Sequence, residues 1–296
     1  MDTHSELGEF LRVRRAALQP EDVGVLNYGI RRVPGLRREE LAMLAGVSTT
    51  YYTRLEQGLS TNASESVINA IARALNLDDD ERPHLFDLAR PGKGRRRVPA
   101  KPDNARPGTL RLIQSMTSTP AVVLGRRSDV LAWNALGHRL VAGHLDYTAP
   151  ERPSTRPNMT RMLFLDEHTR ELYARWPEEA RRAVASLRLV AGKSADDQEL
   201  ASLVGELTLK SQDFAKLWAK HPVENCMSGL KYMHHPEVGY LELNFEVLTP
   251  PDESGHRVLM YAADPGTPGA EALQLLQTAG NIESDARRTP AGRATR

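Results

Sequence analysis

The sequence predicts two domains, an all-α N-terminal domain followed by an α+β domain with an antiparallel sheet. Residues 35–58 read as two short amphipathic helices joined at a glycine. Residues 90–111 are rich in proline, glycine and basic side chains, which is typical of a linker. Residues 240–248 alternate apolar and polar side chains, which indicates a strand with one solvated face. The linker marks the domain boundary, the helical pair indicates an all-α first domain, and the strand indicates a sheet in the second.

The segment 35–58 has the pattern of a helix-turn-helix. Its first helix carries apolar residues at three- and four-residue spacings, namely Leu36, Leu41, Leu44 and Ala45. Gly46 interrupts this period where a sharp turn needs a left-handed residue, and Ser48 is a suitable N-cap for the second helix. In that helix Tyr52 and Leu55 share one face, which leaves the opposite face free to meet DNA.

Further amphipathic helices are expected around this motif, at residues 7–18, 64–77 and 78–89. With the two motif helices they complete a five-helix domain over residues 1–89. The second domain is expected at 112–279 and the tail at 280–296 is expected to be disordered.

The second domain contains segments with the two-residue period of strands and segments with the 3.6-residue period of helices. Short strands are predicted at residues 121–124, 130–132, 229–234, 240–248 and 257–262. Helices are predicted at residues 134–140, 177–190, 200–207, 214–218 and 270–279. The strands lie on both sides of a helical block, so the sheet is interrupted by helices.

Charge and composition indicate the cellular compartment and the part of the chain that could bind phosphates. The chain of 296 residues has a net charge of only +1, but residues 90–111 hold eight lysines and arginines against one aspartate. This basic segment has two readings, a phosphate-binding linker and a solvated one. The single Cys226 fits a reducing cytoplasm, and no apolar run is long enough to span a membrane. We therefore expect a cytoplasmic protein.

The second motif helix presents hydrogen-bonding side chains at its start, where a recognition helix meets base edges. Thr49, Thr50 and Thr53 are the predicted base contacts. The predicted phosphate contacts are basic or polar residues near the motif, namely Arg15, Arg38, Tyr51, Arg54 and Asn62. The alternative is a helical hairpin that only packs or dimerises.

Catalytic patterns are missing from the sequence. It contains no Cys-x-x-Cys, no His-Glu-x-x-His and no glycine-rich phosphate loop. His234 and His235 are adjacent, so on a strand they point to opposite faces. We expect no enzymatic activity, no metal and no cofactor.

Two parts of the sequence resemble known protein families. Residues 37–58, RREELAMLAGVSTTYYTRLEQG, are similar to the signature of lambda-repressor/Cro-like (XRE-family) helix-turn-helix domains. Many members have Thr-Gln where this chain has Arg37 and Arg38. Residues 112–279 resemble the MmyB-like ligand-binding domain, on segments that include VLAWN at 130–134, NMTRMLFLD at 158–166, SQDFAKLWAKHPV at 211–223 and HHPEVGYLELNFEVL at 234–248.

The resemblance implies a one-component bacterial transcription regulator with a PAS-like domain that holds a small hydrophobic molecule, in some relatives a fatty acid. We expect a homodimer that reads an inverted-repeat operator in double-stranded DNA. The candidate ligand-binding residues are Trp133, Asn158, Arg161, Phe164, Tyr232, His235 and Phe245. Arg161 or Lys231 would pair with a carboxylate head group.

Other interpretations of the second domain remain open. The aromatic candidates could be ordinary core residues, and the polar ones could tie down a loop. The whole domain could be a protein-interaction and dimerisation module without a small ligand, or an enzyme regulated in cis.

Overall fold

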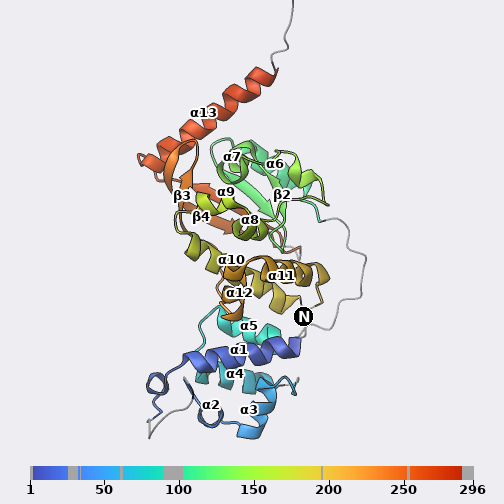
Figure 1. Ribbon diagram of the computed structural model, residues 1–296, viewed down its shortest axis with the longest axis vertical. Coiled ribbons are helices and arrows are strands. Elements are labelled where there is room, and N and C mark those ends of the chain that lie inside the picture. Colours follow the sequence, from blue (N-terminus) through green and yellow to red (C-terminus); the bar gives the residue numbers. More distant parts are fainter. Residues whose placement is uncertain are drawn as a thin grey trace, which may run out of the picture. The chain divides into compact units, whose positions relative to one another are not determined.

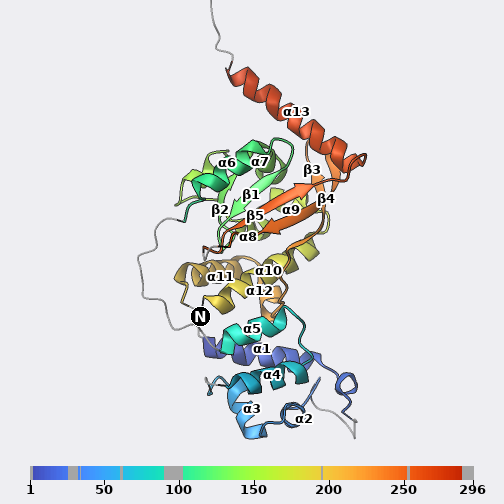
Figure 2. The same cartoon turned by 180° about the vertical axis from the view of Figure 1, so that it is seen from behind.

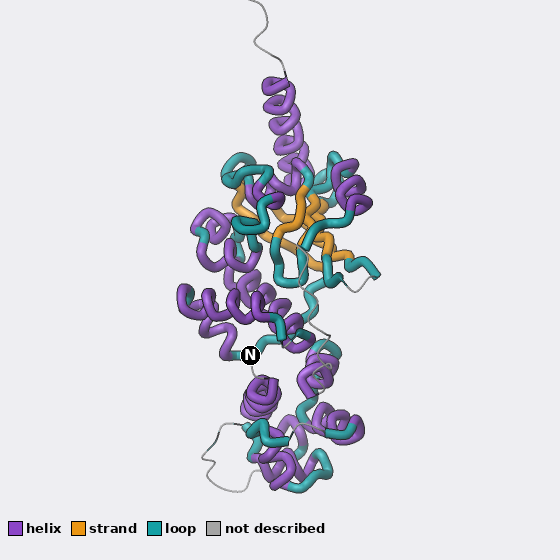
Figure 3. Tube along the Cα trace, turned by 90° about the vertical axis from the view of Figure 1, so that its right-hand side faces the viewer, coloured by secondary structure: helices purple, strands orange, loops and turns teal. Residues whose placement is uncertain are grey.

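The computed structural model describes residues 3–25, 33, 35–60, 63–89, 103–194, 196–251 and 254–288. It divides into two compact units, and each consists of two stretches of the chain. The first unit comprises Met1–Val98 and Val184–Asn225, and the second comprises Pro99–Ala183 and Cys226–Arg296. Within these described residues, the first unit contains helices and loops, and all strands of the sheet belong to the second (Figure 3).

The N-terminal part of the first unit confirms the five predicted helices. They are α1 (Thr3–Ala17), α2 (Arg38–Leu44), α3 (Thr49–Glu56), α4 (Glu65–Ala74) and α5 (Glu81–Ala89), with a short 3-10 turn η1 (Pro20–Val23). Helix α1 lies between α5 on one side and α3 and α4 on the other (Figures 1 and 2). Phe10 and Leu11 of α1 are fully buried in the core that these helices share.

Residues 184–225 also belong to this unit, although the sequence places them inside the second domain. They form the later part of α10 (Trp176–Lys193) together with α11 (Gln198–Lys210) and α12 (Gln212–Ala219). Arg188 is only 1% exposed, donates to Glu6 at 2.7 Å and lies 3.8 Å from the ring centroid of Trp218. Arg14 of α1 donates to the carbonyl of His221 at 2.8 Å. Val223 is part of the N-terminal core and Leu189 of α10 packs against it, so this block shares apolar contacts with the N-terminal helices as well.

The second unit contains the sheet and the helices around it. Its strands are β1 (Ala121–Leu124), β2 (Val130–Trp133), β3 (Ser228–His235), β4 (Gly239–Leu248) and β5 (Arg257–Ala262). Its helical elements are α6 (Pro107–Ser115), α7 (Ala135–Ala142), η2 (Ala149–Glu151), α8 (Met159–Leu165), α9 (Glu167–Leu172), the first part of α10, and α13 (Pro268–Arg288).

The sheet is antiparallel throughout, with the strand order β2-β1-β5-β4-β3. The predicted alternation in β4 is confirmed, because Leu241, Leu243 and Phe245 are buried while Glu242 and Glu246 are exposed. Figure 2 shows β5 between β1 and β4, so strands from both ends of the domain sequence meet at the centre of the sheet.

Asn134 fixes the start of α7 against the sheet. Its buried Oδ1 accepts hydrogen bonds from the backbone of Gly137 at 2.7 Å and of Ala121 at 3.0 Å. The predicted N-cap therefore also connects the helix to β1.

Two boundary predictions are wrong. Residues 280–288, expected to be disordered, continue helix α13, since the sequence meets no proline before residue 290. The linker expected to reach residue 111 ends earlier, because Pro107 occupies the first turn of α6, a position that suits proline. The basic residues 90–102 lie outside the described residues.

Gly192 allows α10 to approach α5 closely. A Cβ at this position would lie 2.7 Å from the ring of His84, whereas a Cβ at Gly205 of α11 would meet nothing within 4 Å. We predict that Gly192→Ala lowers the free energy of unfolding by about 1–3 kcal/mol through overpacking. The control Gly205→Ala should leave stability unchanged or raise it by up to about 1 kcal/mol through helix propensity. Urea denaturation measures both changes, and equal effects would contradict this packing.

The buried histidines of the first unit make its stability depend on pH. Burial, followed by the positive charge of Arg188, lowers the pKa of both His84 and His221 to about 3. The unfolded chain binds protons near pH 6.5 and the folded chain does not. Stability is therefore fully present above pH 6.5 and falls as the pH decreases below it, by up to about 1.4 kcal/mol per pH unit for each histidine.

Urea denaturation at pH 5.0 and 7.5 measures this dependence. In His84→Leu the difference between the two pH values should shrink, while in the exposed-site control His234→Gln it should stay as in the parent chain. An unchanged difference in His84→Leu would show that His84 does not contribute.

Candidate nucleic-acid interface and ligand pocket

The turn between α2 and α3 is built as the sequence predicts. Gly46 has a φ of +65°, in the left-handed region, and the backbone N–H of Val47 donates to the carbonyl of Ala42 at 2.9 Å. The side chain of Ser48 accepts a hydrogen bond from the backbone of Tyr51 at 3.1 Å and caps α3. Leu44, expected in the buried stripe, is 38% exposed because it lies at the end of α2 beside this turn.

Helix α3 has a buried face and an open one. Tyr52 and Leu55 are fully buried in the core. The base contacts predicted for this helix lie on its other side, where Thr49 and Thr50 are exposed and Thr53 is half-buried. The first turn of the helix therefore offers hydroxyl and methyl groups to a partner.

Glu56, the last residue of α3, binds two arginines from different helices. Its carboxylate accepts from Nε and Nη2 of Arg15 at 2.8 and 2.9 Å, and from Nε of Arg38 at 2.9 Å. Burial opposes its ionisation, but the hydrogen bonds and charges of the two guanidinium groups hold the pKa of Glu56 below its usual value.

The predicted phosphate contact at Arg15 needs correction. Arg15 is 8% exposed, and its remaining Nη1 donates to the carbonyl of Leu36 at 2.6 Å. All three nitrogens of its guanidinium therefore have hydrogen-bond partners within the domain. The sequence shows the charge of Arg15 but not these partners. Arg15 is a scaffold residue that joins α1 to α3.

The other predicted phosphate contacts lie in different settings. The Arg38 side chain is 44% exposed although it binds Glu56, so part of the guanidinium remains accessible at the start of α2. Arg54 is exposed, and Tyr51 is half-buried against the core. Asn62 lies outside the described residues.

Trp133 and Asn158, predicted as ligand contacts, have structural partners in the second unit. The indole of Trp133 donates to the carbonyl of Tyr147 at 2.8 Å. Asn158 caps α8, and its Nδ2 donates to the carbonyl of Arg127 at 2.8 Å and to Asp129 at 3.0 Å. The alternative reading of Asn158, a residue that ties down a loop, agrees with these contacts.

The remaining aromatic candidates pack against neighbours in the same unit. Phe164 meets Trp176 edge to face, with ring centroids 5.6 Å apart. The guanidinium carbon of Arg175 lies 3.6 Å from the ring centroid of Tyr232. Arg161 follows Asn158 on α8 and is half-buried.

Lys231, one of the predicted carboxylate partners, already has an acidic partner. Its ammonium forms a buried ion pair with Glu179 of α10 and lies 4.4 Å from the ring centroid of Phe245. Two buried phenols, Tyr173 and Tyr261, complete this region, and burial raises the pKa of each. A carboxylate ligand would have to displace Glu179 to reach Lys231.

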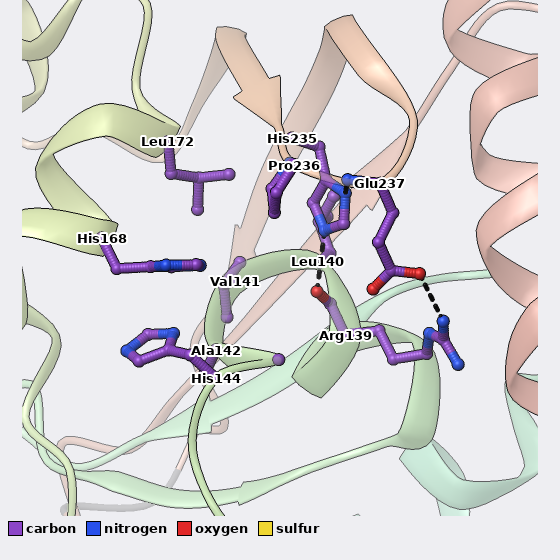
Figure 4. Close-up of a pocket in the computed structure, with 11 residues that line it drawn as sticks. Arg139, Leu140, Val141, Ala142, His144, His168, Leu172, His235, Pro236 and Glu237 are labelled. Atoms are coloured by element: carbon purple, nitrogen blue, oxygen red, sulfur yellow. Dashed lines mark hydrogen bonds and ion pairs between the residues drawn. The ribbon is translucent and has the colours of Figure 1, made fainter. Parts of the chain in front are cut away.

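A pocket of about 210 Å³ lies on the second unit between α7, α9 and the turn that joins β3 to β4 (Figure 4). Its lining residues are Arg139, Leu140, Val141, Ala142, Gly143, His144, His168, Leu172, His235, Pro236 and Glu237. His235 is the one predicted ligand residue among them. The other six candidates are not part of this lining.

His235 lines the pocket, and both of its ring nitrogens already have backbone hydrogen-bond partners. Its Nε2 lies 3.0 Å from the carbonyl of Arg139, and its Nδ1 accepts from the backbone of Glu237 at 3.2 Å. His144 and His168 line the opposite side (Figure 4). The sequence could not identify them, because the pocket joins three segments that are far apart along the chain.

Among the described residues there is no cluster of three histidine, cysteine, aspartate or glutamate side chains suited to a metal ion. Of the helices in these same parts of the chain, none is both long enough and apolar enough to cross a membrane.

Comparisons with known proteins agree with both halves of this description. A family model of a helix-turn-helix domain matches residues 6–85. The model of the MmyB-like transcription regulator ligand binding domain matches residues 105–276, more than half of the chain. A search of curated proteins finds no significant match. Both matched families are regulator domains, and the second match includes the helical block that packs with the N-terminal helices.

The carboxylate of Glu56 should be essential for the stability of the N-terminal domain. Glu56→Gln leaves the guanidinium of Arg15 buried without a charged partner, so we expect a loss of about 3 kcal/mol in the free energy of unfolding. In the control Glu39→Gln, the side chain is 64% exposed and lies 3.8 Å from Arg37, so the change should stay within about 0.5 kcal/mol. Similar urea midpoints for both variants would be inconsistent with this role of Glu56.

Proposed function

Since the chain belongs to the MmyB-like transcription regulators, we propose that it binds an operator sequence through α3 and senses a small hydrophobic ligand through its C-terminal domain. The helix-turn-helix and the ligand-binding domain together make it a DNA-binding transcription regulator. The observation that supports sequence-specific binding is the open face of α3, where Thr49 and Thr50 are exposed on a helix whose other face is buried.

In this proposal α3 enters the major groove and its threonines contact base edges. Threonine hydroxyls donate to or accept from several bases, and their methyl groups contact thymine. Arg38, Tyr51, Arg54 and Asn62 contact phosphates and set the position of the helix. Because Glu56 binds the inner side of the Arg38 guanidinium, Arg38 has a fixed direction before DNA arrives.

We further propose that the chain acts in the cytoplasm as a homodimer. A two-fold dimer presents two recognition helices to half-sites about one turn of DNA apart, which gives an inverted-repeat operator. A fatty acid is the ligand class that the family resemblance favours. No catalytic step, metal or cofactor is needed for this function.

The ligand acts by favouring one arrangement of the recognition helices over another. Helix α10 contributes to both units, since Glu179 binds Lys231 of β3 and Arg188 binds Glu6 of α1. The chain thus has one continuous helix that contributes a buried side chain to an ion pair in each unit, which supports α10 as the element that connects ligand state to DNA binding.

DNA binding can be tested with an operator selected from random sequences, using fluorescence anisotropy at several salt concentrations. Thr50→Ala should weaken binding about tenfold through loss of base contacts, with an unchanged salt dependence. Arg54→Ala should weaken binding to all sequences and reduce the slope of log K against log salt by about one. Arg152→Ala is the matched control and should bind as the parent chain does, because Arg152 belongs to the other unit, lies outside the basic segment and has a side chain that is 55% exposed.

Two outcomes would contradict the proposal. An affinity that does not depend on salt would exclude phosphate neutralisation as a driving force. Base recognition by α3 would be excluded if the parent chain and Thr50→Ala had the same affinity for the operator, and if each bound random DNA as tightly as the operator.

A further inference from the structure

The pocket beside α7 has a size that suits a compact organic molecule. An apolar cavity of about 150 Å³ holds one benzene molecule, so a pocket of about 210 Å³ takes about six to eight carbon atoms. Its apolar lining consists of Leu140, Val141, Ala142, Leu172 and Pro236. These side chains offer a dry surface to the body of a ligand, and specificity then depends on the few polar groups at the rim.

Most polar groups of the rim already have partners. Glu237, the acidic residue in the lining, forms an ion pair with Arg139 at 2.5 Å. Both ring nitrogens of His235 interact with backbone atoms. The rim therefore shows no uncompensated acidic group to a ligand, and its remaining polar groups are two imidazoles.

These imidazoles belong to His144 and His168, whose ring centroids are 4.2 Å apart. Nε2 of His144 lies 2.9 Å from a carboxylate oxygen of Asp166, which leaves Nδ1 for a second interaction. Within the described residues the ring of His168 has no hydrogen bond. Both side chains line the pocket on the side opposite Pro236 (Figure 4).

We propose that this pocket binds a small carboxylate with a compact apolar body, and that His144 and His168 donate hydrogen bonds to its carboxylate. This rests on the proposed function, because it assigns the ligand class and the binding residues of the sensor domain. The head group is held by the histidine pair, and Lys231 stays in its ion pair with Glu179.

Carboxylate binding is coupled to protonation of the histidine pair. A neutral His144 that donates its one N–H to Asp166 has no second N–H for a ligand, so a carboxylate at Nδ1 favours uptake of a proton. The charged or titratable groups near the pair on α7 and before α9 are Asp166, which lies 2.9 Å from Nε2 of His144, and His138 and Arg139. His235 and Glu237 complete the groups on the facing turn, and Glu237 is balanced by Arg139. Affinity should therefore rise as the pH decreases from 8 to 6.

Isothermal titration calorimetry of the full chain with sodium benzoate tests the proposal, with benzamide as the uncharged probe of the same shape. We expect benzoate to bind at pH 6.0 at least tenfold more tightly than at pH 8.0, and at least tenfold more tightly than benzamide. Titrations in two buffers of different ionisation enthalpy should show net proton uptake on benzoate binding. His168→Gln should weaken benzoate binding about tenfold, as expected for loss of a charge-assisted hydrogen bond.

His234→Gln is the matched control, because His234 is exposed on β3 and is not part of the pocket. Its benzoate affinity should equal that of the parent chain, and thermal unfolding checks that both variants fold. Equal binding of benzoate and benzamide, no loss in His168→Gln, or no proton uptake would overturn the proposal. Operator binding is measured separately without benzoate, so a chain that binds DNA but not benzoate refutes this inference and leaves the proposed DNA-binding function intact.

Discussion

The buried carboxylate of Glu56 determines how the recognition helix is held. It accepts hydrogen bonds from Arg15 of α1 and from Arg38 of α2, so three helices meet at one charged group. A buried carboxylate is costly unless its partners are close and well aligned, and any displacement of α3 would separate them. The direction of the exposed threonines of α3 therefore depends on an ion-pair network at the C-terminal end of this helix.

Local sequence patterns were enough to predict most helices and strands, because periodicity depends on neighbours along the chain. They could not show which surface covers an apolar stripe: residues 184–225 lie within the family match to the second domain, yet in the structure they form one compact unit with the N-terminal helices. The same limit explains Arg15, whose charge is visible in the sequence while its partner Glu56 lies 41 residues away. A basic residue beside a DNA-binding motif is read as a phosphate contact until its partners are known.

The proposed ligand pocket shows even more clearly that local sequence patterns do not predict tertiary contacts. Aromatic residues such as Phe164 and Phe245 attract attention in the sequence, yet each is part of the packed interior. The pocket instead forms where the end of α7, helix α9 and the β3–β4 turn converge. Its histidines come from segments with no periodic signal, so only the tertiary structure places His144 beside His168.

In the proposed function, the contacts of helix α10 limit how a ligand acts on DNA binding. The pairs Glu179–Lys231 and Arg188–Glu6 resist small displacements, because Glu179, Lys231 and Arg188 are buried and a stretched ion pair of a buried group loses its attraction without regaining water. Such contacts favour a few discrete arrangements over a continuous range. A tenfold change in operator affinity requires a difference of only about 1.4 kcal/mol between two arrangements. That is comparable to one charge-assisted hydrogen bond, so a ligand that alters a single polar contact of the sensor domain has enough free energy to regulate DNA binding.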